Sequence, residues 1–126
     1  MVGIVIVSHS AKLAEGVVDA TRIMANGCPI AAAGGADDGG YGTSYDKILS
    51  AVNAVYSDDG VILLADMGSA VMTAEMVIES CGHSNVELLD CPIAEGAVAA
   101  SLASLLGDDL ETVKQQAISA KNEAKW

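Results

Sequence analysis

Residues 3–10 read GIVIVSHS, a run of small and β-branched apolar residues that ends on a histidine between two serines. An apolar run of this length, followed directly by polar residues, is typical of a buried strand whose carboxyl end reaches the surface. His9 is one of only two histidines in the chain. The stretch therefore predicts a central strand with a titratable side chain at its exposed end.

Residues 61–69, VILLADMGS, repeat this pattern with an aspartate, Asp66, after the strand. Two weaker strands are expected at CPIAAA (28–33) and VELL (86–89). Helical periodicity predicts helices over residues 10–26, 44–56, from 68 or 69 to about 80, 93–106 and 108–124. This alternation predicts an α/β fold: a doubly wound, mainly parallel sheet of about four strands with helices on both faces.

The usual doubly wound order places strand 3–7 between strands 28–33 and 61–65. A crevice then opens at the carboxyl ends of the two central strands, where ligands of such sheets bind. His9 and Asp66 should lie there side by side. His83 precedes the last strand, so we expect it in a turn at the opposite end.

Composition and charge limit the functions open to this chain. Its 126 residues predict one domain, and no apolar run is long enough to span a membrane. A formal charge of −11 without a basic cluster argues against nucleic acid and anionic membranes, and favours a basic protein partner. Three cysteines at scattered spacing, and no basic leader before the first strand, indicate a reducing, cytoplasmic location.

An aspartate bound to one imidazole nitrogen leaves the other nitrogen free to act as a nucleophile. Three helices are expected to begin near His9, and helix N-termini suit a phosphoryl group. We therefore predict His9 as the phosphoryl-accepting nucleophile and Asp66 as the residue that orients it. The predicted phosphate ligands are small or hydroxyl residues at those helix starts: Ser10, Gly42, Thr43, Ser44, Gly68 and Ser69. The sequence contains no nucleotide-binding motif, so no nucleotide cofactor is expected. No metal site is expected either, because His9 and Asp66 lack a third metal ligand.

Other interpretations remain at this point. His9 could be a structural residue whose ring is satisfied at a strand end. A receiver-like signalling domain would need acidic residues where this chain has Ser8, His9 and Ser10, and a flavin carrier would need a phosphate loop and aromatic residues there.

Three separated segments, GIVIVSHSAKLAEG (3–16), AAAGG…DGGYGTS (31–44) and LLADMGSAVMTAEM (63–76), resemble the phosphotransferase subunits of phosphoenolpyruvate-dependent dihydroxyacetone kinase, the DhaM family. These subunits have the fold of mannose-class EIIA domains. The resemblance implies that the chain is a single EIIA-type phosphocarrier domain, 1–126. It also implies an enzyme component in which His9 receives phosphate from enzyme I through HPr. The phosphate would then pass to ADP on the nucleotide-binding subunit of the kinase.

The chain departs from the usual family pattern at Met67, Thr73 and Tyr41. Met72 and Met76 lie one helical turn apart on the face opposite the apolar stripe, where they would be covered by a neighbouring helix or by a subunit contact. Because relatives are dimers, we expect a homodimer. The alternative function is a regulatory module of a phosphotransferase system, phosphorylated on His9 as a signal.

Overall fold

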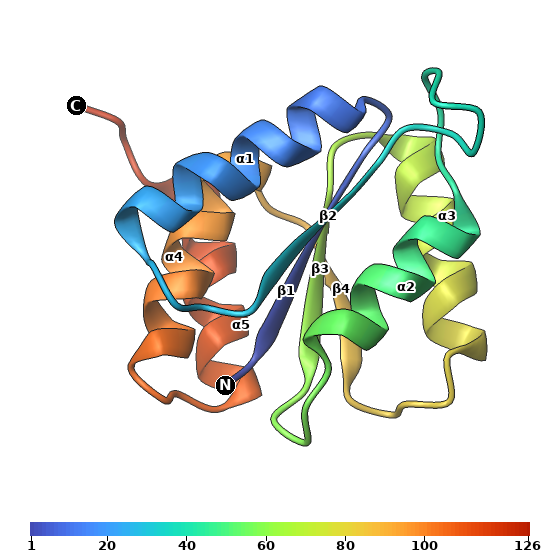
Figure 1. Ribbon diagram of the computed structural model, residues 1–126. Helices are drawn as coiled ribbons and strands as arrows, with labels where there is room; N and C mark the ends of the chain where they lie inside the picture. The colour runs from blue at the N-terminus through green and yellow to red at the C-terminus, as the bar shows by residue number, and fades with distance from the viewer.

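The expected strands form one parallel sheet with the order β2-β1-β3-β4 in the computed structural model, which describes residues 1–126 (Figure 1). The strands are β1 (Gly3–Ser8), β2 (Ile30–Gly34), β3 (Val61–Ala65) and β4 (Val86–Leu89). The order confirms the prediction of a doubly wound α/β fold with its central strands at β1 and β3. The second strand begins two residues later than expected, because residues 28 and 29 precede the ladder.

Five α-helices cover the two faces of the sheet. They are α1 (Ala11–Met24), α2 (Tyr45–Val55), α3 (Gly68–Ser80), α4 (Ile93–Leu105) and α5 (Leu110–Ser119), followed by a 3-10 turn η1 (Ala120–Asn122). In Figure 1, α1, α4 and α5 lie on one side of the sheet and α2 and α3 on the other. The last helix is shorter than the segment 108–124 that periodicity suggested. No helix is both long and apolar enough to cross a membrane.

The two central strands are buried on both faces. Alternate residues of a strand point to opposite faces, so Ile4, Ile6 and Leu64 pack beneath α1, α4 and α5. Val5, Val7 and Leu63 pack beneath α2 and α3. All six side chains are fully buried. Because burial on both faces holds the central strands in place, it also fixes the positions of the residues that follow them, His9 and Asp66.

Helix α1 buries only half of the apolar stripe that helical periodicity predicts for it, which runs through Leu13, Val17, Thr21 and Met24. Val17 and Thr21 are buried as expected, but Leu13 and Met24 are 46% and 62% exposed, and Ala14 and Val18 are buried as well. The small side chain of Ala14 lets the helix approach Gly34 at the end of β2, where an added Cβ would lie 2.9 Å from the Ala14 Cβ. The same Cβ would lie 2.6 Å from the backbone oxygen of Ser10. Close backbone contact thus sets the start of α1 against the sheet.

Replacing each of two buried serines of α4 by alanine should have opposite effects on the free energy of unfolding. The Ser104 hydroxyl donates to the backbone oxygen of Val2 at 2.7 Å, whereas the buried Ser101 hydroxyl has no partner. We expect Ser101→Ala to raise the free energy of unfolding by about 1 kcal/mol, and Ser104→Ala to lower it by about 1–3 kcal/mol because the Val2 carbonyl is left unpaired. Urea unfolding of both variants tests this. A stability loss in Ser101→Ala as large as that in Ser104→Ala would contradict it.

Candidate functional site

The histidine and the aspartate meet at the carboxyl end of the sheet. Val7 of β1 pairs with Ala65 of β3, so His9 and Asp66 follow neighbouring strand ends. His9 Nδ1 lies 3.1 Å from Asp66 Oδ1, and the backbone N–H of His9 donates to Asp66 Oδ2 at 3.2 Å. The two side chains are only 20% and 10% exposed. The pair is therefore held from both the ring and the backbone, at the crevice that the topology predicts.

This geometry decides which ring nitrogen is available. A carboxylate only accepts hydrogen bonds, so the proton of a neutral His9 ring belongs on Nδ1, facing Asp66. The lone pair of Nε2 then points away from Asp66. The Ser69 hydroxyl contacts Nε2 at that position. Nε2 is thus the ring nitrogen whose lone pair is available, with a hydroxyl directly beside it.

The surroundings of Asp66 favour its ionised form. Burial alone would raise the pKa of this carboxyl, but hydrogen bonds from the Ser8 hydroxyl, the His9 backbone and the His9 ring together hold the pKa below its ordinary value. Asp66 is therefore a carboxylate at neutral pH. It can orient the ring and balance positive charge that develops on it.

Helix α3 begins beside this pair without a side-chain cap. Its N-cap residue, Met67, makes no side-chain hydrogen bond to the first turn. The helices α1, α2 and α5 are instead capped by Ser10, Ser44 and Asp109. Uncapped N–H groups and the helix dipole attract anions. Gly68 and Ser69 in this first turn are exposed, so an anionic group on Nε2 would find free donors there.

Two of the other predicted phosphate ligands support the backbone around His9. The Ser10 hydroxyl accepts from the N–H of Leu13 at 3.2 Å and so caps α1. The N–H of Gly42 donates to the backbone oxygen of His9 at 3.0 Å. Both residues lie next to His9, and their role toward a phosphate stays a prediction.

The remaining two, Thr43 and Ser44, have protein partners for their hydroxyls. Thr43 shares a hydrogen bond of 2.8 Å with Thr73 of α3. The buried Ser44 caps α2 and donates to Asp37. Thr73 donates onward to the backbone oxygen of Ser69 at 3.0 Å. Thr73, one of the three residues that depart from the family pattern, thus links the glycine-rich loop before α2 to the helix beside His9. No sequence pattern indicated this contact.

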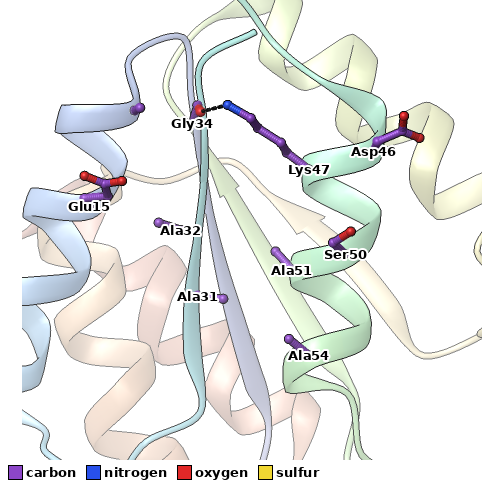
Figure 2. Close-up of a pocket in the computed structure, with 10 residues that line it drawn as sticks. Glu15, Ala31, Ala32, Gly34, Asp46, Lys47, Ser50, Ala51 and Ala54 are labelled. Atoms are coloured by element: carbon purple, nitrogen blue, oxygen red, sulfur yellow. Dashed lines mark hydrogen bonds between the residues drawn. The ribbon is translucent and has the colours of Figure 1, made fainter. Parts of the chain in front are cut away.

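The lysines near the site differ in their surroundings. Lys47 donates to the backbone oxygens of Gly34 and Ala36 at 3.1 and 3.0 Å. Figure 2 shows it reaching from α2 across the edge of β2, at the rim of a hollow of about 560 Å³ between α1 and α2. The side chain of Lys12, in the first turn of α1, makes no hydrogen bond or ion pair within the chain. The other five cationic side chains each bind a carboxylate or a carbonyl oxygen.

His83 lies between α3 and β4, at the opposite end of the sheet from His9, as expected. Its ring stacks on Tyr56 with centroids 3.7 Å apart and planes 15° apart. It is thus partly covered rather than a freely solvated turn residue. The methionines of α3 are exposed as the sequence suggested: Met72 to 68% and Met76 to 57%.

Comparisons with known proteins assign the class. Residues 3–114 match the family model EIIA-man, described as the PTS system fructose IIA component. The chain belongs to this family of phosphotransferase-system IIA components.

Two similar proteins within this class are DhaM subunits of dihydroxyacetone kinases. The chain is 40% identical to the phosphoryl donor subunit DhaM of PEP-dependent dihydroxyacetone kinase from Pantoea ananatis, over 95% of this chain but 27% of that protein. It is 34% identical to the phosphotransferase subunit DhaM of the PTS-dependent dihydroxyacetone kinase from Lactococcus lactis, over 90% of this chain and 91% of that protein. These relatives confirm the resemblance seen in the sequence.

Two solved structures share the fold. The crystal structure of the unknown function protein EF1359 is 28% identical with a TM-score of 0.84, covering 99% of this chain and 98% of that one. A sigma-54 interaction domain protein from Enterococcus faecalis, 18% identical, has a TM-score of 0.71 over 92% of this chain and 87% of that one, a likeness of fold alone.

Proposed function

We propose that the chain is a phosphohistidine carrier for a dihydroxyacetone kinase. In this proposal Nε2 of His9 accepts a phosphoryl group from HPr, which is charged by phosphoenolpyruvate through enzyme I. The group then passes to ADP held on the nucleotide-binding subunit of the kinase. The observation that carries the proposal is the His9–Asp66 pair, which directs Nε2 to the uncapped start of α3. The DhaM relatives, named as phosphoryl donor or phosphotransferase subunits of dihydroxyacetone kinase, support the kinase as the destination. HPr as donor and ADP as acceptor are what the family resemblance implies.

The first transfer needs no proton to move. The Nε2 lone pair attacks the phosphorus, an Nε2–P bond forms, and the bond between the phosphorus and the donor group of HPr breaks. The electron pair of that bond returns to the donor group. His9 keeps its proton on Nδ1 and gains a positive charge, which the carboxylate of Asp66, 3.1 Å away, stabilises.

The second transfer reverses this flow of charge. An oxygen of the β-phosphate of ADP attacks the phosphorus, the Nε2–P bond breaks, and its electrons neutralise the ring.

Before the first attack the Ser69 hydroxyl must turn away from the Nε2 lone pair. It can then donate to a phosphoryl oxygen together with the free N–H groups of α3.

The surface favours protein partners of basic character, because the chain carries a net charge of −11. We also propose that two copies associate through the exposed methionines of α3, since flexible Met side chains adapt well to a contact. A reducing cytoplasm is the compartment that this relay and the three free cysteines suggest.

The carrier role is tested by following one labelled phosphate through both steps. The chain is incubated with labelled phosphoenolpyruvate, enzyme I and HPr, purified, and then mixed with the ADP-loaded kinase subunit. We expect the label to enter this chain and to leave it as ATP. Label that enters but never leaves would overturn the carrier role in favour of the regulatory one. Label that never enters would overturn both.

A further inference from the structure

Ser8 is the last residue of β1, and its hydroxyl lies between the site and the start of α1. The side chain is fully buried. Its Oγ donates to Asp66 Oδ2 at 2.8 Å and accepts the N–H of Ser10 at 3.0 Å. A backbone N–H only donates and a carboxylate only accepts. The Ser8 proton therefore has one direction available, toward Asp66.

We propose that Ser8 is a positioning residue for phosphoryl transfer: its hydroxyl holds the Asp66 carboxylate in the orientation that keeps the His9 proton on Nδ1. The inference rests on the proposed function, in which Nε2 is the atom that reacts. Ser8 does not contact His9 Nε2, so it acts entirely through Asp66.

The two oxygens of the Asp66 carboxylate have different hydrogen-bond partners, which supports this role. Oδ1 faces the His9 ring, while Oδ2 receives the Ser8 hydroxyl at 2.8 Å and the longer His9 N–H bond at 3.2 Å. The last side-chain torsion of an aspartate has a broad distribution, so the plane of the carboxylate rotates readily unless hydrogen bonds hold it. Without Ser8 only one longer hydrogen bond holds Oδ2. The plane of the carboxylate, and with it the proton on Nδ1, is then less well fixed.

The serine also supports the fold, because its Oγ accepts from Ser10. Loss of the hydroxyl leaves that N–H without its partner, which costs stability of its own. A fall in activity alone would not separate the two effects. The position of the ring proton does, because a purely structural role leaves it unchanged in the folded protein.

The experiment compares Ser8→Ala and Ser8→Cys with Ser104→Ala. The thiol keeps the shape of the hydroxyl but is a weak donor. Ser104 is an equally buried serine with a hydrogen-bonded hydroxyl in α4. ¹⁵N NMR of the imidazole reports the populations of the Nδ1–H and Nε2–H tautomers of His9. The rate of phosphorylation by phosphoramidate, a small donor, reports the reactivity of Nε2 without any partner protein.

In both Ser8 variants we expect the Nε2–H tautomer to become populated and the phosphorylation rate to fall about tenfold or more, the loss expected for one hydrogen bond to a charged group. Ser104→Ala should lose stability but keep the wild-type tautomer and rate. A folded Ser8→Cys or Ser8→Ala protein with wild-type tautomer populations would overturn the proposal. A wild-type chain that accepts phosphate from phosphoramidate but not from HPr would overturn the carrier function and leave the role of Ser8 intact.

Discussion

We expect a His9→Ala chain to accept no phosphoryl group from phosphoenolpyruvate, enzyme I and HPr, and the wild type to accept one. The variant removes Nε2, and no other side chain beside the start of α3 offers an unprotonated nitrogen nucleophile. Serine and threonine hydroxyls there lack a base to activate them. Intact mass before and after mild acid treatment measures the result, because a phosphoramidate-type P–N bond is lost in acid while a phosphoester survives.

His83→Ala is the matched control for this experiment. It removes the other histidine, which stacks on Tyr56 at the opposite end of the sheet. We expect this variant to take up one acid-labile phosphate at the wild-type rate. Phosphate on His9→Ala, or its absence from His83→Ala, would show that the acceptor has been assigned to the wrong residue.

Asp66→Ala should slow phosphoryl acceptance by about 10²-fold or more, through loss of both ring orientation and charge stabilisation. The variant leaves Nδ1 without its acceptor, so the ring proton is free to occupy Nε2. It also leaves the Ser8 hydroxyl and the His9 N–H without their partner. Rapid-quench measurement with labelled HPr gives the rate constant. A wild-type rate in a folded Asp66→Ala protein would rule out the role assigned to this carboxylate.

The Asp66→Asn variant keeps the shape of the side chain but removes its charge. The pH dependence of stability therefore gives an independent check of the ionised state of Asp66. Since the pKa of Asp66 is lower in the folded chain than its ordinary value, the folded state binds fewer protons there than the unfolded state. Its contribution to stability is therefore present above the ordinary pKa and is lost as pH falls through the folded pKa. In acid unfolding monitored by circular dichroism, Asp66→Asn should lose that part of the pH dependence.

The central strands and the pairing of His9 with Asp66 could be predicted because both follow from local patterns. Apolar runs such as VILLA are too short and too branched for a helix, and parallel strands end at the same edge of a sheet. The face of α1 could be predicted only in part from periodicity, which places Val17 and Thr21 correctly but not Leu13 or Met24. Ala14 is buried in place of Leu13 because the helix approaches the backbone at Gly34, a contact between residues twenty positions apart.

The hydroxyls of the site show a further limit of sequence reasoning. Ser44 appeared at a helix start and suggested a phosphate ligand, but its hydroxyl caps that helix and binds Asp37. Ser8 appeared as a polar residue just after the predicted strand 3–7 and suggested no partner. Its contact with Asp66 depends on the register of β1 against β3, and hydrogen-bond partners of that kind are set only once strands pair.

The arrangement of the cations affects how fast a partner finds the site. Five of the six lysine and arginine side chains are tied to acceptors within the chain, which leaves Lys12 as the free positive charge, close to His9. An approaching protein meets a field that is negative almost everywhere. At physiological salt that field extends about 8 Å. We expect encounters with a basic surface to be accelerated at low ionic strength and slowed by added salt. The proposed flow of phosphate through His9 would then depend on the ionic medium as well as on the chemistry of the ring.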